Sequence, residues 1–164
     1  MNGDNESMNP YLMISLPLSA ITYRNLVGAI PPARFDEASA DGRFSPREVI
    51  AHVADWEPIL RGRIRQAVES PDSTVQGIDE GQRAIEKNYR GTSLEEQLRI
   101  FEHERRATIE YLQSLGGEDW SKQVMHSERG RMSVGDMANM LLGHDIYHFE
   151  QLSEFLQEKS AGTW

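Results

Sequence analysis

The sequence predicts an all-α protein built as a four-helix bundle. Four long segments repeat apolar residues at helical spacing, three of them behind recognisable N-terminal caps, and no segment shows a convincing strand pattern. The chain has 164 residues, which is typical of one domain, and it contains no internal repeat or low-complexity tract. We therefore expect a single domain over residues 1–164, with residues 1–10 frayed.

The first helix is expected from about Ser15 to Gly28, and the sequence "PPAR" at 31–34 ends it. Pro17 is then tolerated because it falls in the first turn, where its missing N–H costs no hydrogen bond. The apolar residues do not share one face: one stripe is Leu18, Thr22 and Ala29, and the others are Ile21, Leu26, Val27 and Ile30. A helix that is apolar on more than one side must present its second side to a partner unless it is deeply buried, so we expect a homodimer.

The second helix has the clearest start. In "FSPREV", Ser45 is the N-cap, Pro46 is the first helical residue and Glu48 completes a capping box. Its apolar face is Val49, Val53, Trp56, Leu60, Ile64 and Ala67. Pro58 interrupts this face and predicts a kink one turn beyond His52.

The third long helix starts at "TSLEEQ", with Thr92 or Ser93 as its cap, and ends at the glycines 116–117. A short helix is expected before it, over "DEGQRAIEKNY". The apolar face of the third long helix is Leu94, Leu98, Phe101, Thr108, Leu112 and Leu115. Arg105 falls on that same face, where a charged side chain needs a partner.

The segment "EDWSKQVMHSERGRMS" predicts a loop or a short hairpin that turns at Gly130. Ser133 then caps the fourth long helix, with Asp136 three residues later. We expect this helix to run to about Lys159.

Composition excludes several classes of function. The net charge is −9, and the basic runs at 61–65 and 105–106 are short and flanked by acids, which disfavours nucleic-acid binding. The apolar run at 11–18 is too short to span a membrane and lacks the preceding basic residues of a signal peptide. Cysteine is absent, so there is no disulfide, thiolate nucleophile or cysteine-bound metal. We expect a cytoplasmic protein that binds neither nucleic acid nor membranes.

Three of the five histidines lie on or beside apolar helix faces. His144 and His148 are four residues apart, so their side chains can converge on one ion, and His52 lies at the edge of the second helix's apolar face. A lone histidine in such a place is usually a hydrogen-bonded core residue, and a pair at this spacing also occurs by chance. Three together favour a three-histidine metal site with an open position. His103 lies about half a turn from its helix's apolar face and should be solvated.

Three segments together resemble the DinB-like (DinB/YfiT) superfamily: "FSPREVIAHVADWE", "MHSERGRMSVGDM" and "LLGHDIYHFEQL". The similar family features are an "HLxDWE"-type segment on the second helix, a loop with histidine and then glycine, and a closing "HDxxHxxQ". Each motif alone is modestly specific. Their order and spacing over roughly residues 12–158 make the resemblance strong.

The resemblance implies an up-down-down-up four-helix bundle that holds a divalent metal ion on His52, His144 and His148. It implies a metal-dependent hydrolase or a transferase that uses a low-molecular-weight thiol such as bacillithiol or mycothiol, acting on a small-molecule substrate through a metal-bound water or thiol. Homodimers are common among such proteins. Three imidazoles suit Zn, Ni or Fe, and the sequence does not choose among them. The alternative is a non-catalytic dimeric bundle that binds a small ligand or a metal.

Six further residues are candidates around the ion. Asp145 could accept the free N–H of a ligand histidine or pair with Arg105, and we favour the pairing. Gln151, one turn after His148, could bond a ligand or the water on the metal. Trp56 is expected in the core rather than as a substrate wall. His126 could border the pocket or cap its own loop, and Glu57 is a weaker candidate base.

Overall fold

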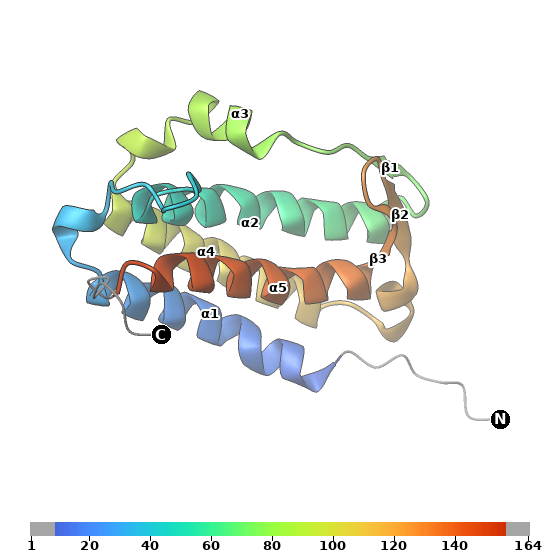
Figure 1. Ribbon diagram of the computed structural model, residues 1–164. Helices are drawn as coiled ribbons and strands as arrows, with labels where there is room; N and C mark the ends of the chain where they lie inside the picture. The colour runs from blue at the N-terminus through green and yellow to red at the C-terminus, as the bar shows by residue number, and fades with distance from the viewer. Residues whose placement is uncertain (1–8, 157–164) are drawn as a thin grey trace, which may run out of the picture.

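The computed structural model describes residues 9–156, which form four long helices packed side by side (Figure 1). The long helices are α1 (Pro10–Ala29), α2 (Pro46–Glu69), α4 (Leu94–Gln113) and α5 (Val134–Ser153). α1 and α2 each pack against both α4 and α5. Figure 1 shows α1 and α5 running in one direction and α2 and α4 in the other, so the predicted up-down-down-up bundle is confirmed.

The predicted caps explain where three of these helices begin. The Ser45 hydroxyl accepts a hydrogen bond from the Glu48 backbone N–H at 3.3 Å, and the Glu48 carboxylate accepts one from the Ser45 N–H at 3.0 Å. Ser133 and Asp136 form the same reciprocal pair before α5. Ser93 caps α4. These bonds satisfy donors that a helix start otherwise leaves unpaired, and they fix the rotational phase of each helix.

The expected start of the first helix was wrong. α1 begins at Pro10, because the Asn9 side chain accepts from the Tyr11 N–H at 3.0 Å and Pro10 occupies the first turn. Pro17 therefore lies inside the helix rather than in its first turn. The inward face is Leu12, Leu16, Ser19, Tyr23 and Val27, while Leu18 and Ile21 point outward.

A small sheet closes one end of the bundle. β2 (Gln123–His126) and β3 (Gly130–Ser133) form the expected hairpin, and Gly130 has a φ of 76°, which favours glycine. β1 (Thr74–Val75), which the sequence did not predict, adds to β2 in parallel. The remaining short elements are α3 (Glu80–Glu86) and the 3₁₀ turns Pro32–Arg34, Tyr89–Gly91 and Gly117–Ser121. α5 ends at Ser153; the expected end at Lys159 lies outside the described residues.

The core contains two large apolar clusters, with polar side chains between them, and a small third one of Ala51, Ala84 and Tyr89. One cluster, towards the sheet, includes Leu60, Leu112 and Leu141, and the other includes Val53, Phe101 and Leu152. On α4 and α5 the buried polar residues fall in the sequence between members of the two clusters. On these two helices the buried polar residues therefore lie at mid-height of the bundle.

Candidate metal centre

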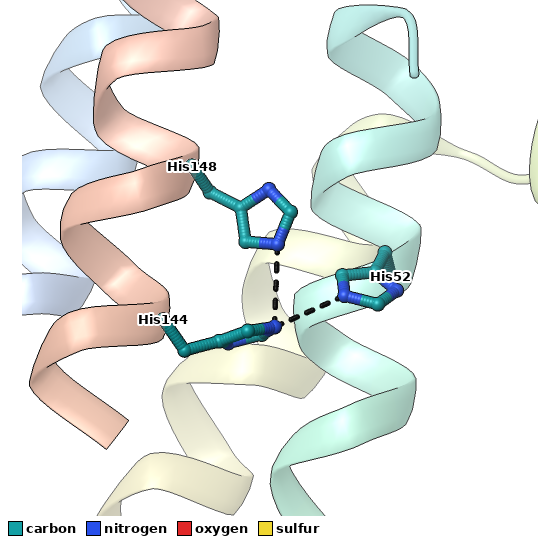
Figure 2. A group of neighbouring side chains, drawn as sticks. All are labelled: His52, His144 and His148. Atoms are coloured by element: carbon teal, nitrogen blue, oxygen red, sulfur yellow. Dashed lines mark hydrogen bonds between the residues drawn. The ribbon is translucent and has the colours of Figure 1, made fainter. Parts of the chain in front are cut away.

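Three histidines from two helices point at one another (Figure 2). His52 comes from α2, and His144 and His148 come from successive turns of α5. The Nε2 atom of His144 lies 3.0 Å from that of His52 and 3.2 Å from that of His148. One nitrogen of each ring falls within 4.8 Å of the other two. The i, i+4 spacing on α5 and the capped start of α2 bring these side chains to the same level.

A chain of hydrogen bonds fixes the orientation of His148. The Gln151 amide nitrogen donates to the Phe44 carbonyl at 3.0 Å, so its oxygen must face His148. His148 Nδ1, 3.0 Å from that oxygen, therefore carries the proton. Because the neutral ring has only one N–H, the Nε2 lone pair of His148 points at the other histidines. The predicted bond from Gln151 to a candidate ligand is present.

Protons cannot satisfy the contacts among the three rings. With Nε2 of His148 unprotonated, a hydrogen bond to it requires a proton on Nε2 of His144. That single proton cannot serve both of the close contacts that His144 makes with His52 and His148. A cation held by Nε2 of His52 leaves the proton of that ring on Nδ1, which is buried without a partner among residues 9–156. A cation at the centre satisfies all three lone pairs at once.

Burial keeps the three rings neutral. Desolvation is the main cause that lowers the pKa of His52 to about 2, of His144 to about 3 and of His148 to about 4. Neighbouring histidines lower the pKa values of His52 and His144 further. Neutral imidazole is the form that binds metal ions, so the cluster is ready to act as a ligand set at neutral pH.

The donor set and its dimensions fit a divalent ion. Zinc binds imidazole nitrogen at about 2.0–2.1 Å, which places two tetrahedral ligands about 3.3 Å apart. The two close nitrogen–nitrogen distances, 3.0 and 3.2 Å, are near that value. In the described part of the chain the group contains three histidines and no fourth ligand. Three protein ligands leave a coordination position for a water or a substrate.

A cavity of about 250 Å³ lies beside the cluster and is bordered by His144 and Trp56. Its walls come from α2, α3, the hairpin turn and α5: Trp56, Leu60, Arg63, Glu80, Arg129, Met140, Gly143, His144 and Tyr147. Trp56 is buried as predicted, and it also lines this space, 5.4 Å ring to ring from His52. A larger cavity of about 480 Å³ near Phe44 and Tyr89 does not border the histidines. The smaller cavity is therefore the one that borders the histidine cluster.

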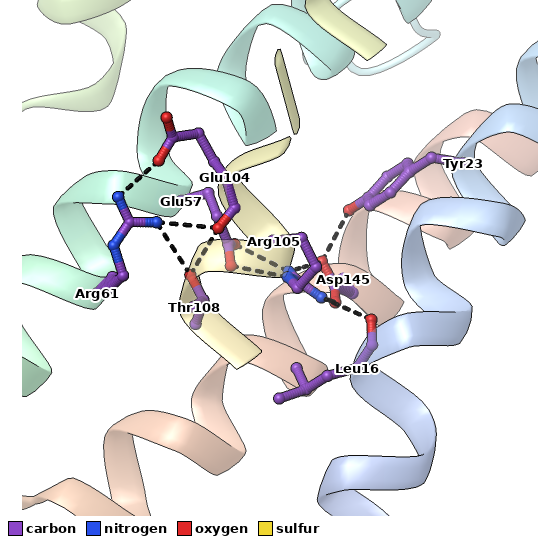
Figure 3. Close-up of polar contacts among 8 residues, drawn as sticks. All are labelled: Leu16, Tyr23, Glu57, Arg61, Glu104, Arg105, Thr108 and Asp145. Atoms are coloured by element: carbon purple, nitrogen blue, oxygen red, sulfur yellow. Dashed lines mark hydrogen bonds and ion pairs between the residues drawn. The ribbon is translucent and has the colours of Figure 1, made fainter. Parts of the chain in front are cut away.

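A second buried polar cluster surrounds Arg105 (Figure 3). Its guanidinium donates to Asp145 at 2.7 and 3.0 Å, so the predicted pairing is present. It also donates to both carboxylate oxygens of Glu57, at 2.7 and 2.9 Å. The Tyr23 hydroxyl donates to Asp145 at 3.3 Å. Residues of all four long helices are thus joined next to the histidines.

This network changes how two candidates are interpreted. Asp145 pairs with Arg105 and not with one of the three histidines, although it lies between His144 and His148 in the sequence. Glu57, considered as a base, has both oxygens engaged by Arg105 and is only 2% exposed. Sequence reasoning missed Glu57 and Tyr23 as members of the cluster. Both residues lie on inward helix faces, which indicated that they would be buried. The sequence does not show which buried acid forms the ion pair with an arginine.

The remaining histidines lie outside the cluster. His126 is buried in β2, and its Nδ1 accepts a hydrogen bond from the Glu128 N–H at 3.2 Å. It therefore caps its own loop, one of its two expected roles, and it is not among the residues that border the cavity. His103 is exposed on α4, as predicted.

Fold and side chains together define a four-helix-bundle protein with a buried cluster of three histidines. The family model of the DinB superfamily matches residues 21–152, and the chain therefore belongs to this superfamily. A relative from Oceanobacillus iheyensis, named "Putative metal-dependent hydrolase OB0782", is 22% identical over 136 residues, which is 83% of this chain and 78% of the relative.

Two solved structures share the fold. YfiT from Bacillus subtilis, described as a probable metal-dependent hydrolase with an unusual four-helix bundle topology, has a TM-score of 0.83 at 14% identity, covering 94% of this chain and 91% of YfiT. A mycothiol-dependent maleylpyruvate isomerase has a TM-score of 0.71 at 15% identity, covering 87% of this chain and 59% of the isomerase. The described helices include none long and apolar enough to cross a membrane.

Proposed function

We propose that this protein is a mononuclear metal-dependent enzyme whose ion is held by His52, His144 and His148. The observation that carries the proposal is the convergence of three neutral imidazole nitrogens whose contacts protons cannot satisfy. Zn, Ni and Fe all suit such a ligand set. When bound, the ion supplies Lewis acidity that lowers the pKa of a coordinated water or thiol towards neutrality.

The protein's own residues then have distinct tasks. The three histidines hold the ion, and Gln151 keeps His148 in the tautomer that presents Nε2. The Arg105 cluster fixes α2 against α5, which carry the ligands. The cavity beside His144 admits a small-molecule substrate. The buried Trp56 ring forms one wall of this cavity and excludes water there.

We favour hydrolysis as the reaction, because a relative and a structural neighbour are both named for metal-dependent hydrolysis. Thiol-dependent transfer or isomerisation is the second candidate, supported by the shared fold of the mycothiol-dependent isomerase. This chain contains no cysteine, so a reacting thiol would have to come from a cosubstrate.

The test is a comparison of metal-free protein with protein reloaded with Zn, Ni or Fe. Both forms are assayed against small esters and amides, and against electrophiles with and without an added thiol. We expect turnover only in a reloaded form, its loss in His144→Ala, and its retention in the matched surface variant His103→Ala. Turnover that survives complete metal removal would contradict the proposal. Full metal occupancy without turnover on any substrate would favour the non-catalytic alternative.

We also propose that two copies associate through α1. Its outward face exposes a stripe of large apolar side chains with helical spacing: Tyr11, Ile14, Leu18 and Ile21, each more than half exposed. A continuous apolar stripe on a helix is typical of a protein–protein contact, and a two-fold dimer is the commonest closed solution.

Light scattering at micromolar concentration tests this association. A mass near twice the 18.7 kDa chain is expected for the wild type. Ile14→Glu combined with Leu18→Glu should give a monomer, whereas Ile85→Glu, at an exposed apolar residue of α3, should not. A wild-type mass of one chain, unchanged by tenfold concentration, would overturn the dimer.

A further inference from the structure

Two arginines border the same cavity as His144. Arg63 lies on α2, two turns beyond Trp56, and Arg129 lies in the turn between β2 and β3. The cavity volume of about 250 Å³ equals the liquid volume of about eight water molecules, which is enough for a small organic molecule. His144 of the candidate metal centre and two arginines therefore line one space.

Within residues 9–156, Arg63 forms no ion pair or hydrogen bond with a carboxylate. Its side chain is largely buried, with 8% of the residue exposed, and its one hydrogen bond goes to the Gln76 carbonyl at 3.2 Å. The guanidinium lies over the Trp56 ring, 5.5 Å from its centre. Burial is the main cause that lowers the pKa of Arg63; Arg129 lowers it further, and the charges of Glu128 and Glu80 partly oppose this shift. The acids near Arg63 thus compensate its charge only in part and without direct contact.

Other arginines in the bundle show that this is not a shortage of acids. Arg61, two residues earlier, pairs with Glu104 at 2.6 Å, and Arg105 is held by two carboxylates. The sequence has 26 acidic residues against 17 basic ones. Glu80 also lines the cavity, but the structure shows no ion pair between it and either arginine there. A buried arginine that forms no ion pair in such an acidic chain is suited to bind an external anion.

Two more groups in the lining lack a good acceptor. The indole N–H of Trp56 is buried without a hydrogen-bond partner in the described residues, although this group can only donate. Arg129 donates to the thioether of Met140 at 3.1 Å, which is a weak acceptor. The lining therefore offers several donors and positive charge, next to the apolar side chains of Leu60 and Met140.

We propose that Arg63, the Trp56 N–H and Arg129 bind the carboxylate of a small substrate, whose remaining part lies against His144. A carboxylate only accepts hydrogen bonds, and its two oxygens match the fork of a guanidinium. The apolar residues suit a hydrocarbon body attached to that carboxylate. As a statement about the substrate, this inference rests on the proposed metal-dependent function; as a binding site, it does not require the ion.

Benzoate and benzamide are the matched probes, because they have nearly the same shape and differ in charge. The readout is the NMR resonance of the Trp56 indole N–H, identified by its loss in Trp56→Phe. We expect benzoate to shift this resonance in a saturable way in metal-free and in metal-loaded protein, and benzamide to bind about tenfold more weakly or worse.

Arg63→Gln should weaken benzoate binding about tenfold or more, and Arg129→Gln, a change at an exposed residue, should weaken it several-fold. Arg63→Lys, which keeps the charge, should recover part of the loss. Arg106→Gln, at an exposed arginine of α4, is the control and should leave binding unchanged. Equal binding of benzoate and benzamide, or equal benzoate affinity in all these variants, would overturn the inference. Neither outcome would affect metal binding by the histidines, so the two proposals fail separately.

Discussion

The two buried polar clusters of the bundle differ in whether they are complete. Around Arg105 the charges are opposite and close: a guanidinium donates to Glu57 and Asp145, and Tyr23 donates to Asp145. Around His144 three rings of the same kind turn their nitrogens towards one another, and one proton would have to serve two contacts. The first cluster is satisfied by the protein itself, whereas we propose that the second is completed by a cation.

This difference separates two buried polar residues that are neighbours in sequence. Asp145 follows His144 directly, but a helix turns about 100° per residue, so the two side chains face different parts of the interior. Asp145 contributes to the ion pair with Arg105, while His144 borders the cavity. A buried polar residue therefore has to be assigned to its partner in space before a role is given to it.

Disrupting the histidine cluster should cause the greatest loss of metal affinity. His144→Ala combined with His148→Ala removes two of three proposed ligands and should lower metal affinity by more than about 100-fold, because even partners outside the ligand set are worth about 10–100-fold. His103→Ala should bind metal as the wild type does. Calorimetric titration of the metal-free proteins measures both. Undiminished affinity in the double variant would place the ion elsewhere.

Breaking the Arg105 cluster should affect stability rather than ligand chemistry. Arg105→Met leaves Glu57 and Asp145 buried without their cation and should cost on the order of 3–5 kcal/mol in the free energy of unfolding. Arg106→Met, at its exposed neighbour, should cost little. Adding both Glu57→Gln and Asp145→Asn to Arg105→Met should recover much of the loss. Urea unfolding measures this, and strictly additive effects of the three substitutions would show that the three groups do not act as one cluster.

The pH dependence of stability should come mainly from the histidine cluster. The folded-state pKa values of about 2, 3 and 4 lie below the ordinary value of about 6.5 for an unfolded chain. Between these values the unfolded chain binds more protons, so stability is present above about pH 6.5 and is lost as pH falls. Each histidine can contribute up to about 1.4 kcal/mol per pH unit, so metal-free protein should unfold within a few units below pH 6.5.

Urea unfolding of metal-free protein at several pH values from 7.5 to 5 tests this dependence. His148→Gln should make the loss of stability with acid less steep by about one proton, whereas His103→Gln should not change it. The same steepness in wild type and His148→Gln would mean that the buried ring does not carry the effect.

The smallest expected effect concerns the residues beside the ligands. Gln151→Leu removes the acceptor that fixes the His148 tautomer and should weaken metal binding about tenfold. Asp145→Asn should leave metal affinity within about twofold, because its partner is Arg105. Competition against a coloured chelator resolves such differences. If Asp145→Asn has the larger effect, Asp145 acts on the ligand histidines after all.

Local signals made much of the bundle predictable. The capping residues Ser45, Ser93 and Ser133 set the starts of three helices, and the apolar spacing then gave their inward faces. Because these phases are fixed, His52, His144 and His148 could be placed in the interior, and the need of a buried charge for a partner indicated Arg105 and Asp145. The start of α1 was missed because the cap at Asn9 lies within residues 1–10, which were expected to be frayed.

Features that depend on distant contacts could not be predicted. β1 is only two residues long and exists through its pairing with β2. Arg63 appeared in the sequence as part of a short basic run, and Arg129 as part of a loop. Only the packing of the hairpin and of α2 brings them to one cavity beside His144.

The most direct test of a metal centre formed by His52, His144 and His148 is X-ray absorption. The protein is purified without an affinity tag and loaded with zinc. We expect about one tightly held ion per chain, with scattering from three imidazoles at about 2.0–2.1 Å and from one further light ligand. An ion that is lost on dialysis, or one surrounded by carboxylate oxygens without imidazole scattering, would contradict it.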